Sequence, residues 1–217
     1  MIMNEISVIG KNSKLYKLLS KDIQQKFNVC CELSHSEVEK VSKIINPIVF
    51  SFDPKNEESN RRLIEKVVSK TVGKLIYISS TSSDVHDVVK QYRYPRLKWH
   101  IERFIRTLPN YVIVRVGVVG ELTDLSCFYG QIKLSTKDSI LNAIKQSFDH
   151  NSGNVYYYAW VYEFKNGPLF KKLIYRVLIS VYKTSPVLFY ALRPLDFILR
   201  KLKFYNYGYT FISNTQI

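Results

Sequence analysis

The chain has 217 residues, of which 46% are hydrophobic and 14% aromatic, and this composition excludes an intrinsically disordered protein. Its longest apolar runs are too short to span a bilayer, and no basic-then-apolar secretory signal opens the sequence, so we expect a cytoplasmic protein. The formal net charge of +14 favours anionic partners such as nucleotides, phosphorylated sugars or an anionic membrane surface.

The expected secondary structure alternates between strands and helices over the first half of the chain. In chain order we expect a strand at 5–10, a helix at 14–26, strands at 28–33 and 47–52, a helix at 57–70, a strand at 74–80, a helix at 95–107 and a strand at 111–121. The strands are continuously apolar and the helices are amphipathic, which is typical of a parallel sheet covered on both faces. The predicted fold is therefore α/β and doubly wound.

The rhythm changes after residue 121. A capped helix is expected at 135–148 and a strand within 153–164, and residues 168–204 are helical in pattern, basic and strongly apolar. We therefore predict two parts, a nucleotide-binding domain at 1–121 and a small, mostly helical substrate-binding cap at 122–217. The three cysteines and four histidines show no disulfide framework and no metal-ligand spacing, so no metal site is predicted.

A possible catalytic pattern begins where the strand at 74–80 ends in serines. Ser80 is followed after 14 residues by Tyr94, and Lys98 lies four residues further on, at the start of a predicted helix. Tyr129 and Lys133 have the same spacing, but they lack both the preceding strand and the following helix. The alternative interpretation is that Tyr94 and Lys98 are only neighbours on the surface.

The order of these elements resembles the extended short-chain dehydrogenase/reductase superfamily, which includes nucleotide-sugar epimerases, dehydratases and reductases. The resemblance covers roughly the first 120 residues. It is carried by the glycine-ended first strand, by the strand end "YISS", by Tyr94-xxx-Lys98 and by "VIVRVGVVGE", which is similar to the family's Arg-x-x-x-x-Gly strand. It implies a Rossmann-like fold, a nicotinamide dinucleotide cofactor and hydride transfer.

The resemblance also implies roles for the side chains. A free phenol has a pKa of about 10, so Tyr94 would need a nearby cation to exchange a proton with a substrate oxygen at neutral pH. Lys98 would supply that charge and bind the cofactor's ribose hydroxyls, while Ser80, or Thr81 in its place, would hold the substrate oxygen.

The phosphate loop departs from the family pattern of three glycines, because only Gly10 is kept in the run "GKNSKLY". The Ser13 hydroxyl would reach a phosphate, and Lys11 and Lys14 would attract phosphates by charge. Tyr16 stands where helix and strand pack closely, so either the helix is shifted outward or the mode of dinucleotide binding is changed.

Three further features bear on the cofactor and the site. Glu32 lies 22 residues after Gly10, where a carboxylate would bind the adenosine ribose and repel a 2′-phosphate, which predicts NAD rather than NADP. The alternative for Glu32 is an exposed carboxylate at a strand end.

Pro95 favours the first helical position and places Tyr94 at the N-cap. Residues 34–46 are too short for the family's full strand-helix-strand complement.

The C-terminal segments combine apolar and basic residues at helical spacing. The run "FKKLIYRVLISVYK" puts its apolar residues on one side, and "RPLDFILRKLKFY" repeats the pattern. Two interpretations stay open: an apolar stripe that packs on the core, or a basic amphipathic helix at an anionic membrane surface. No zinc finger or RNA-recognition signature is present, so nucleic acid is not expected as a partner.

Two functions follow from these patterns. The first is an NAD-linked enzyme acting on a nucleotide-linked or lipid-carrier-linked sugar in surface polysaccharide synthesis, paired as a homodimer through the helix that carries Lys98. The second is a cofactor-poor relative that serves as a binding or scaffolding protein, located peripherally at the inner face of the membrane.

Overall fold

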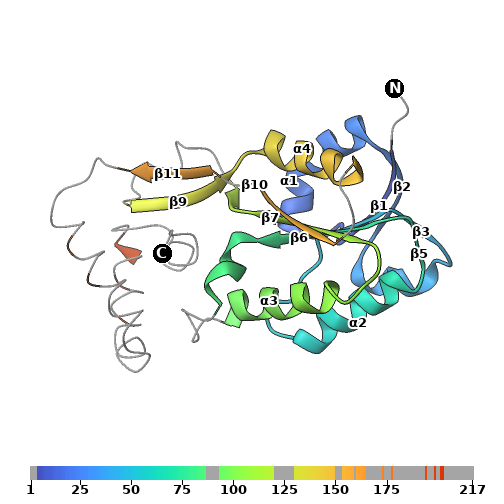
Figure 1. Ribbon diagram of the computed structural model, residues 1–217, viewed down its shortest axis with the longest axis horizontal. Coiled ribbons are helices and arrows are strands. Elements are labelled where there is room, and N and C mark those ends of the chain that lie inside the picture. Colours follow the sequence, from blue (N-terminus) through green and yellow to red (C-terminus); the bar gives the residue numbers. More distant parts are fainter. Residues whose placement is uncertain are drawn as a thin grey trace.

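The computed structural model describes residues 4–86, 93–119, 130–149, 153–158 and 160–164, together with Leu173, Val177, Pro194, Ile198, Lys201 and Leu202. Its centre is a six-stranded sheet whose strands all run parallel (Figure 1). In spatial order the strands are β10 (Asn154–Tyr158), β7 (Tyr111–Val116), β6 (Leu75–Ser80), β4 (Pro47–Val49), β1 (Glu5–Ile9) and β2 (Asn28–Leu33). The prediction of a doubly wound, Rossmann-like α/β fold is confirmed.

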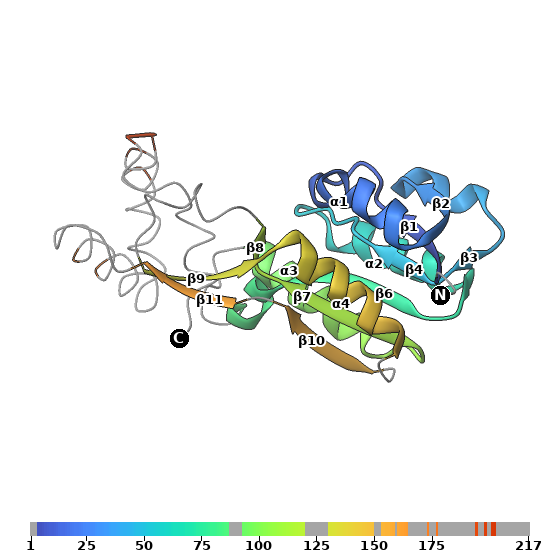
Figure 2. The ribbon, with the colours of Figure 1, turned by 90° about the horizontal axis from the view of Figure 1, so that it is seen from above.

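Two pairs of helices cover the two faces of this sheet, one pair above it and one below it in Figure 1, and the view from above shows the upper pair in front (Figure 2). On one face lie α1 (Lys14–Lys26) and α4 (Lys137–Asp149), and on the other lie α2 (Glu57–Val68) and α3 (Arg93–Ile105). The central strands are buried on both sides, which explains why their sequences are continuously apolar rather than alternating.

The cleft of the fold lies where strand order reverses. From β1 the chain crosses through α1 to β2 on one side, and β4 then pairs with β1 on the other side. In open α/β sheets, ligands bind outside the carboxyl ends of the strands at such a switch point. The ends of β1, β4, β6 and β7 therefore define the edge at which a site is expected.

Smaller elements complete the described part of the chain. A three-stranded sheet joins β8 (Val118–Val119), β9 (Gly130–Ser135) and β11 (Trp160–Phe164), and a two-stranded one joins β3 (Ile44–Ile45) and β5 (Thr71–Val72). Short 3₁₀ helices follow β2 and β6: η1 (His35–Lys40) and η2 (Thr81–Val85). Thus η1 and β3 occupy the segment at 34–46, which the sequence indicated was too short for a full strand-helix-strand unit.

The sheet continues past residue 121, where the sequence analysis placed the end of the first domain. Strand β10 pairs with β7 in parallel register, from Asn154 opposite Val112 to Tyr158 opposite Val116, and α4 packs on the same sheet. The single strand expected within 153–164 is instead two strands that belong to different sheets. Such pairing between distant segments leaves no local signal in the sequence.

The start of α3 also differs from expectation. The helix begins at Arg93, so Tyr94 lies in its first turn rather than at the N-cap, and Pro95 lies in that turn as well. Proline is tolerated there because N–H groups of the first turn have no partner within the helix.

Cys127 and Tyr129 lie outside the described residues, as does most of the predicted C-terminal cap. In the part of the chain that is described, no helix is long and apolar enough to cross a membrane.

Gly10 ends β1 with a backbone that favours glycine, since its φ is +100° and an added Cβ would lie 2.5 Å from the backbone nitrogen of Ser51. Gly153 has a similar φ of +90°, but nothing lies within 4 Å of the same added atom. We expect Gly10→Ala to lower the free energy of unfolding by more than the roughly 1–3 kcal/mol of backbone strain alone, and Gly153→Ala to show only that strain. Urea unfolding of both variants measures the difference, and equal losses would contradict the close approach of Ser51.

Candidate active site

A hollow of about 550 Å³ lies at the carboxyl edge of the sheet, beside the ends of β4, β6 and β7. Ser80, Tyr94 and Lys98 all line it, together with Phe52 and Gly117. Ser80 comes from the end of β6, Tyr94 from the first turn of α3 and Lys98 from the next turn of that helix. The structure brings these three predicted residues together on one hollow.

A second hollow of about 530 Å³ adjoins the first along the same edge. It is lined by Gly10 and Ser13 at the end of β1, and by Ser34 and His35 just beyond β2. Phe52 contributes to both hollows, so the two are neighbours at the switch point. The two hollows therefore lie side by side along the edge of the sheet.

Ser80 ends β6 and begins η2. Its Oγ accepts a hydrogen bond of 3.2 Å from the backbone N–H of Ser82, which caps the 3₁₀ helix, and its hydroxyl also acts to lower the pKa of the Tyr94 phenol. Thr81, the predicted rival of Ser80, is fully buried and is not among the residues that line the hollow. Of the two, Ser80 is therefore the one placed to contact a ligand.

Tyr94 projects from the first turn of α3, and its ring packs nearly at right angles to that of Phe52, with centroids 5.3 Å apart. Although 39% of the residue is exposed, burial of the rest raises the pKa of its phenol, and the hydroxyl of Ser80 acts in the opposite direction. Since an ordinary phenol already has a pKa of about 10, Tyr94 is protonated at neutral pH in the free protein.

Lys98 is 4% exposed, and its ammonium group is held against the sheet. Nζ donates hydrogen bonds of 3.1 Å to Tyr77 Oη and 3.2 Å to the Ile78 carbonyl, and it lies 4.1 Å from the centroid of Phe52. Burial lowers the pKa of Lys98 to about 7, while the carboxylate of Glu102 acts in the opposite direction. Both described hydrogen bonds of Nζ are thus to β6, whereas the sequence analysis expected its charge beside the phenol of Tyr94.

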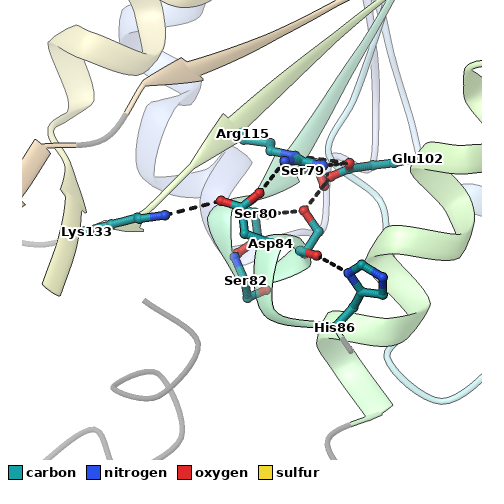
Figure 3. A network of polar contacts seen from close by, with 9 residues as sticks. Ser79, Ser80, Ser82, Asp84, His86, Glu102, Arg115 and Lys133 are labelled. Atoms are coloured by element: carbon teal, nitrogen blue, oxygen red, sulfur yellow. Dashed lines mark hydrogen bonds and ion pairs between the residues drawn. The ribbon is translucent and has the colours of Figure 1, made fainter. Parts of the chain in front are cut away.

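A buried ion pair fixes the elements that carry these residues (Figure 3). Glu102, one turn after Lys98, accepts hydrogen bonds of 3.1 and 3.0 Å from Arg115 Nε, and Ser79 and Ser83 donate to the same carboxylate. Carboxylate and guanidinium are almost fully inaccessible to water, so each charge is stable only because the other neutralises it. The pair ties α3 to β7 and to the serine turn after β6.

The network extends from the main sheet to the second sheet. Arg115 also contacts the carboxylate of Asp84 in η2, and the other oxygen of Asp84 accepts a 3.2 Å hydrogen bond from Lys133 Nζ on β9. Sequence reasoning treated Arg115 only as part of a strand pattern and missed Glu102. The available signal was a carboxylate four residues after Lys98, on the same face of an amphipathic helix.

The phosphate loop is held by its own side chains. Ser13 caps α1 by accepting a 3.1 Å hydrogen bond from the backbone N–H of Tyr16, and it also lines the second hollow. Lys11 Nζ lies 2.7 Å from Glu37 and holds the pKa of that carboxyl to about 2. The charge that the sequence analysis expected Lys11 to offer a phosphate is therefore shared with Glu37, whereas Lys14 lines the first hollow.

Tyr16 and Glu32 both face away from these hollows. The Tyr16 ring lies in the core with its centroid 5.5 Å from that of Phe50, and it lines neither hollow. Glu32 accepts a 2.6 Å hydrogen bond from Gln24 and lines a separate depression between α1 and β2. The predicted role of Glu32 at the ribose thus loses its geometric basis, and with it the argument for NAD over NADP.

No family model matches the sequence, and no curated protein matches it significantly. Solved structures do match. The capsular polysaccharide assembling protein CapF from Staphylococcus aureus is 13% identical with a TM-score of 0.53, over 73% of this chain and 53% of CapF, so this chain spans about half of CapF. UDP-N-acetylglucosamine 4-epimerase from Bacillus cereus is 10% identical with a TM-score of 0.54, over 72% of this chain and 78% of the epimerase.

A short-chain dehydrogenase/reductase superfamily protein from Agrobacterium tumefaciens with bound NAD is 11% identical. The match has a TM-score of 0.57 and covers 82% of this chain and 83% of that protein. The chain therefore has the fold of the short-chain dehydrogenases/reductases and nucleotide-sugar epimerases, as the element order predicted.

The Glu102–Arg115 pair predicts a large loss of stability when one partner becomes neutral. We expect Glu102→Gln to lower the free energy of unfolding by about 3–5 kcal/mol, because it leaves a buried guanidinium without full compensation. Glu65→Gln is the control, since its ion pair with Arg61 is exposed (side chains 47% and 56% accessible) and should cost less than about 1 kcal/mol. Similar losses in both variants, measured by urea unfolding, would show that the buried pair does not hold the site.

The lowered pKa of Lys98 predicts a pH-dependent stability. Between pH 7 and 10.5 an unfolded chain keeps the proton on this lysine while the folded protein releases it, so a rise in pH favours the folded state. The free energy of unfolding of the wild type, relative to that of Lys98→Met, should therefore rise by up to about 1.4 kcal/mol per pH unit in this window. This gain in stability is lost as the pH falls through 7. Urea unfolding at several pH values measures it, with the exposed Lys145→Met as the control. A constant difference between wild type and Lys98→Met would refute the burial of the ammonium.

Proposed function

We propose that this protein is an NAD(P)-dependent reductase or epimerase that acts on a nucleotide-linked or lipid-carrier-linked sugar. The observation that carries the proposal is the single hollow lined by Ser80, Tyr94 and Lys98, next to a second hollow at Gly10. Hydride chemistry on a carbinol or carbonyl needs both a proton-exchanging group and space for a dinucleotide, and these neighbouring hollows would supply both.

The second hollow and the start of α1 would hold the adenosine and phosphate portions of the cofactor. Ser13 and Ser34 line this hollow, and the first turn of α1 contains no acidic residue, so the positive end of the helix dipole is not opposed there. The nicotinamide portion would lie in the first hollow beside Lys98. When bound, the nicotinamide gives or accepts the hydride.

The site residues would act on the substrate oxygen. Ser80 would hold that oxygen by hydrogen bonding, and Tyr94 would donate a proton to it or remove one. The raised pKa of Tyr94 suits the donor role in the reducing direction, since the phenol begins protonated. Two of the three N–H donors of the Lys98 ammonium are used by Tyr77 and Ile78, and the third would serve the cofactor's ribose.

The choice of a sugar substrate has two supports. Structural neighbours include proteins described as capsular polysaccharide assembling and as UDP-sugar epimerases, which favours surface polysaccharide synthesis as the setting. The net charge of +14 would also attract a phosphorylated sugar. Neither support distinguishes reduction, oxidation and epimerisation, which use the same three residues.

A second candidate is a binding or scaffolding protein that has lost catalysis. It is favoured because two ammonium groups that would bind the cofactor already have partners within the protein. Lys11 forms an ion pair with Glu37, and Lys98 donates a hydrogen bond to Tyr77. It is also favoured by Phe52, whose ring lies over Lys98 at the junction of the two hollows. A protein that only binds a partner has no need of a cofactor.

Calorimetric titration with NADH and NADPH separates the two candidates. We expect the wild type to bind one of them, and Lys98→Met to bind it about 10- to 100-fold more weakly, the effect of losing one hydrogen bond to a charged group. Tyr94→Phe should keep cofactor binding. The control Tyr111→Phe should keep it as well, because Tyr111 lies at the start of β7 and its hydroxyl donates to the Gly153 carbonyl. Absence of binding of either dinucleotide to the wild type would overturn the enzyme proposal in favour of the scaffold.

A further inference from the structure

Aliphatic side chains are exposed at helical spacing near the C-terminal end of the chain. Leu173 and Val177 are helical, four residues apart, and 62% and 52% exposed. Ile198 and Leu202 are 50% and 68% exposed and are joined by a 2.9 Å hydrogen bond from Leu202 N to the Ile198 carbonyl. Residues four apart share one face of a helix, so each pair presents an apolar strip to its surroundings. At these positions the apolar side does not pack into the core.

The same segments carry a large part of the protein's charge. Residues 165–217 contain nine lysines and arginines but a single acidic residue, Asp196, which is a net charge of +8 out of +14 for the chain. Lys201, directly before Leu202, is exposed. Apolar strips and cations therefore occur together, a combination typical of helices that lie in a membrane interface.

Elsewhere in the described part of the chain, the large hydrophobic residues that are exposed either line the first hollow or occur singly. Leu18 and Tyr94 line that hollow, and Val72 stands alone on the short strand β5. Isolated exposed apolar side chains are normal on soluble proteins, whereas contiguous exposed apolar patches mark contact surfaces. The two strips thus need an apolar environment that water does not supply.

We propose that these two C-terminal strips, Leu173/Val177 and Ile198/Leu202, dock on an anionic phospholipid bilayer, and that Lys201 and the net positive charge of this stretch of sequence attract the headgroups. A second copy of the chain is a poorer occupant, because both copies carry a net charge of +14 and would repel each other. Nucleic acid would satisfy the charge but offers the aliphatic side chains no hydrocarbon. A bilayer surface supplies both the anions and the apolar layer.

The docking rests on the exposed strips and does not depend on the hydride chemistry. One extension does rest on the proposed function: a protein held at the bilayer surface would meet a lipid-carrier-linked sugar more readily than a nucleotide-linked one. Vesicle binding and NADH binding are separate measurements, so either proposal can fail while the other stands.

Co-sedimentation with vesicles tests the docking. The wild type should sediment with vesicles containing phosphatidylglycerol but not with pure phosphatidylcholine vesicles, and raising the salt concentration should release it. Leu173→Gln combined with Leu202→Gln leaves the charge unchanged and should weaken the partition coefficient about tenfold or more. Val72→Gln is the matched control, since Val72 is also about half exposed (49%) but lies on β5, and it should bind like the wild type.

Each other outcome would overturn the proposal. Failure of the wild type to sediment with anionic vesicles would do so, as would an equal loss in Val72→Gln. A dimer of the wild type that the double variant loses, without vesicle binding, would assign the strips to self-association. Should the double variant fail to fold by circular dichroism, Lys201→Gln serves in its place, and it should reduce binding to the anionic vesicles at low salt.

Discussion

The ion pair between Glu102 and Arg115 is the interaction on which the arrangement of the site depends. It lies beneath the carboxyl edge of the sheet, where it joins α3 to β7 and gathers the hydroxyls of Ser79 and Ser83 onto one carboxylate. The turn that presents Ser80 and the helix that presents Tyr94 and Lys98 are thereby fixed to the same buried charges. Through Asp84 and Lys133 the same contacts reach the second sheet, so the two sheets share one electrostatic anchor.

The electrostatics of the site follow from the partial or full burial of its ionisable groups. Burial lowers the pKa of Lys98 to about 7 and raises that of Tyr94, so both shifts favour the neutral forms. Glu102 opposes the first shift, which links the structural pair to the protonation of the site. A bound anionic ligand would add a further stabilising charge near Lys98. The free protein is thus best suited to give a proton from Tyr94, and removal of a proton by Tyr94 would require charges that a ligand brings.

The sequence predicted the strands and helices of the first half because each carries a complete local pattern, an apolar run or an amphipathic face. The sequence also predicted that Ser80, Tyr94 and Lys98 lie at one edge of the sheet, because strand ends and the starts of the following helices meet at the carboxyl edge of a parallel sheet. It could not predict that β10 joins that sheet, because the pairing partner lies about 40 residues earlier in the chain. The direction of Glu32 could not be predicted either, because successive strand residues face opposite sides. The hydrogen bonds of Lys98 depend on Tyr77, whose position only packing decides.

The proposed chemistry requires that the amine of Lys98 is buried in a hollow that receives the nicotinamide portion of a dinucleotide. Nitrogen-15 NMR of lysine Nζ groups across a pH titration, with and without NADH or NADPH, tests this requirement directly. We expect one resonance that titrates near pH 7, is missing in Lys98→Met, and moves when a dinucleotide is added. A wild type in which every lysine titrates near its ordinary value, or in which the Lys98 resonance ignores both dinucleotides, would show that the requirement is not met.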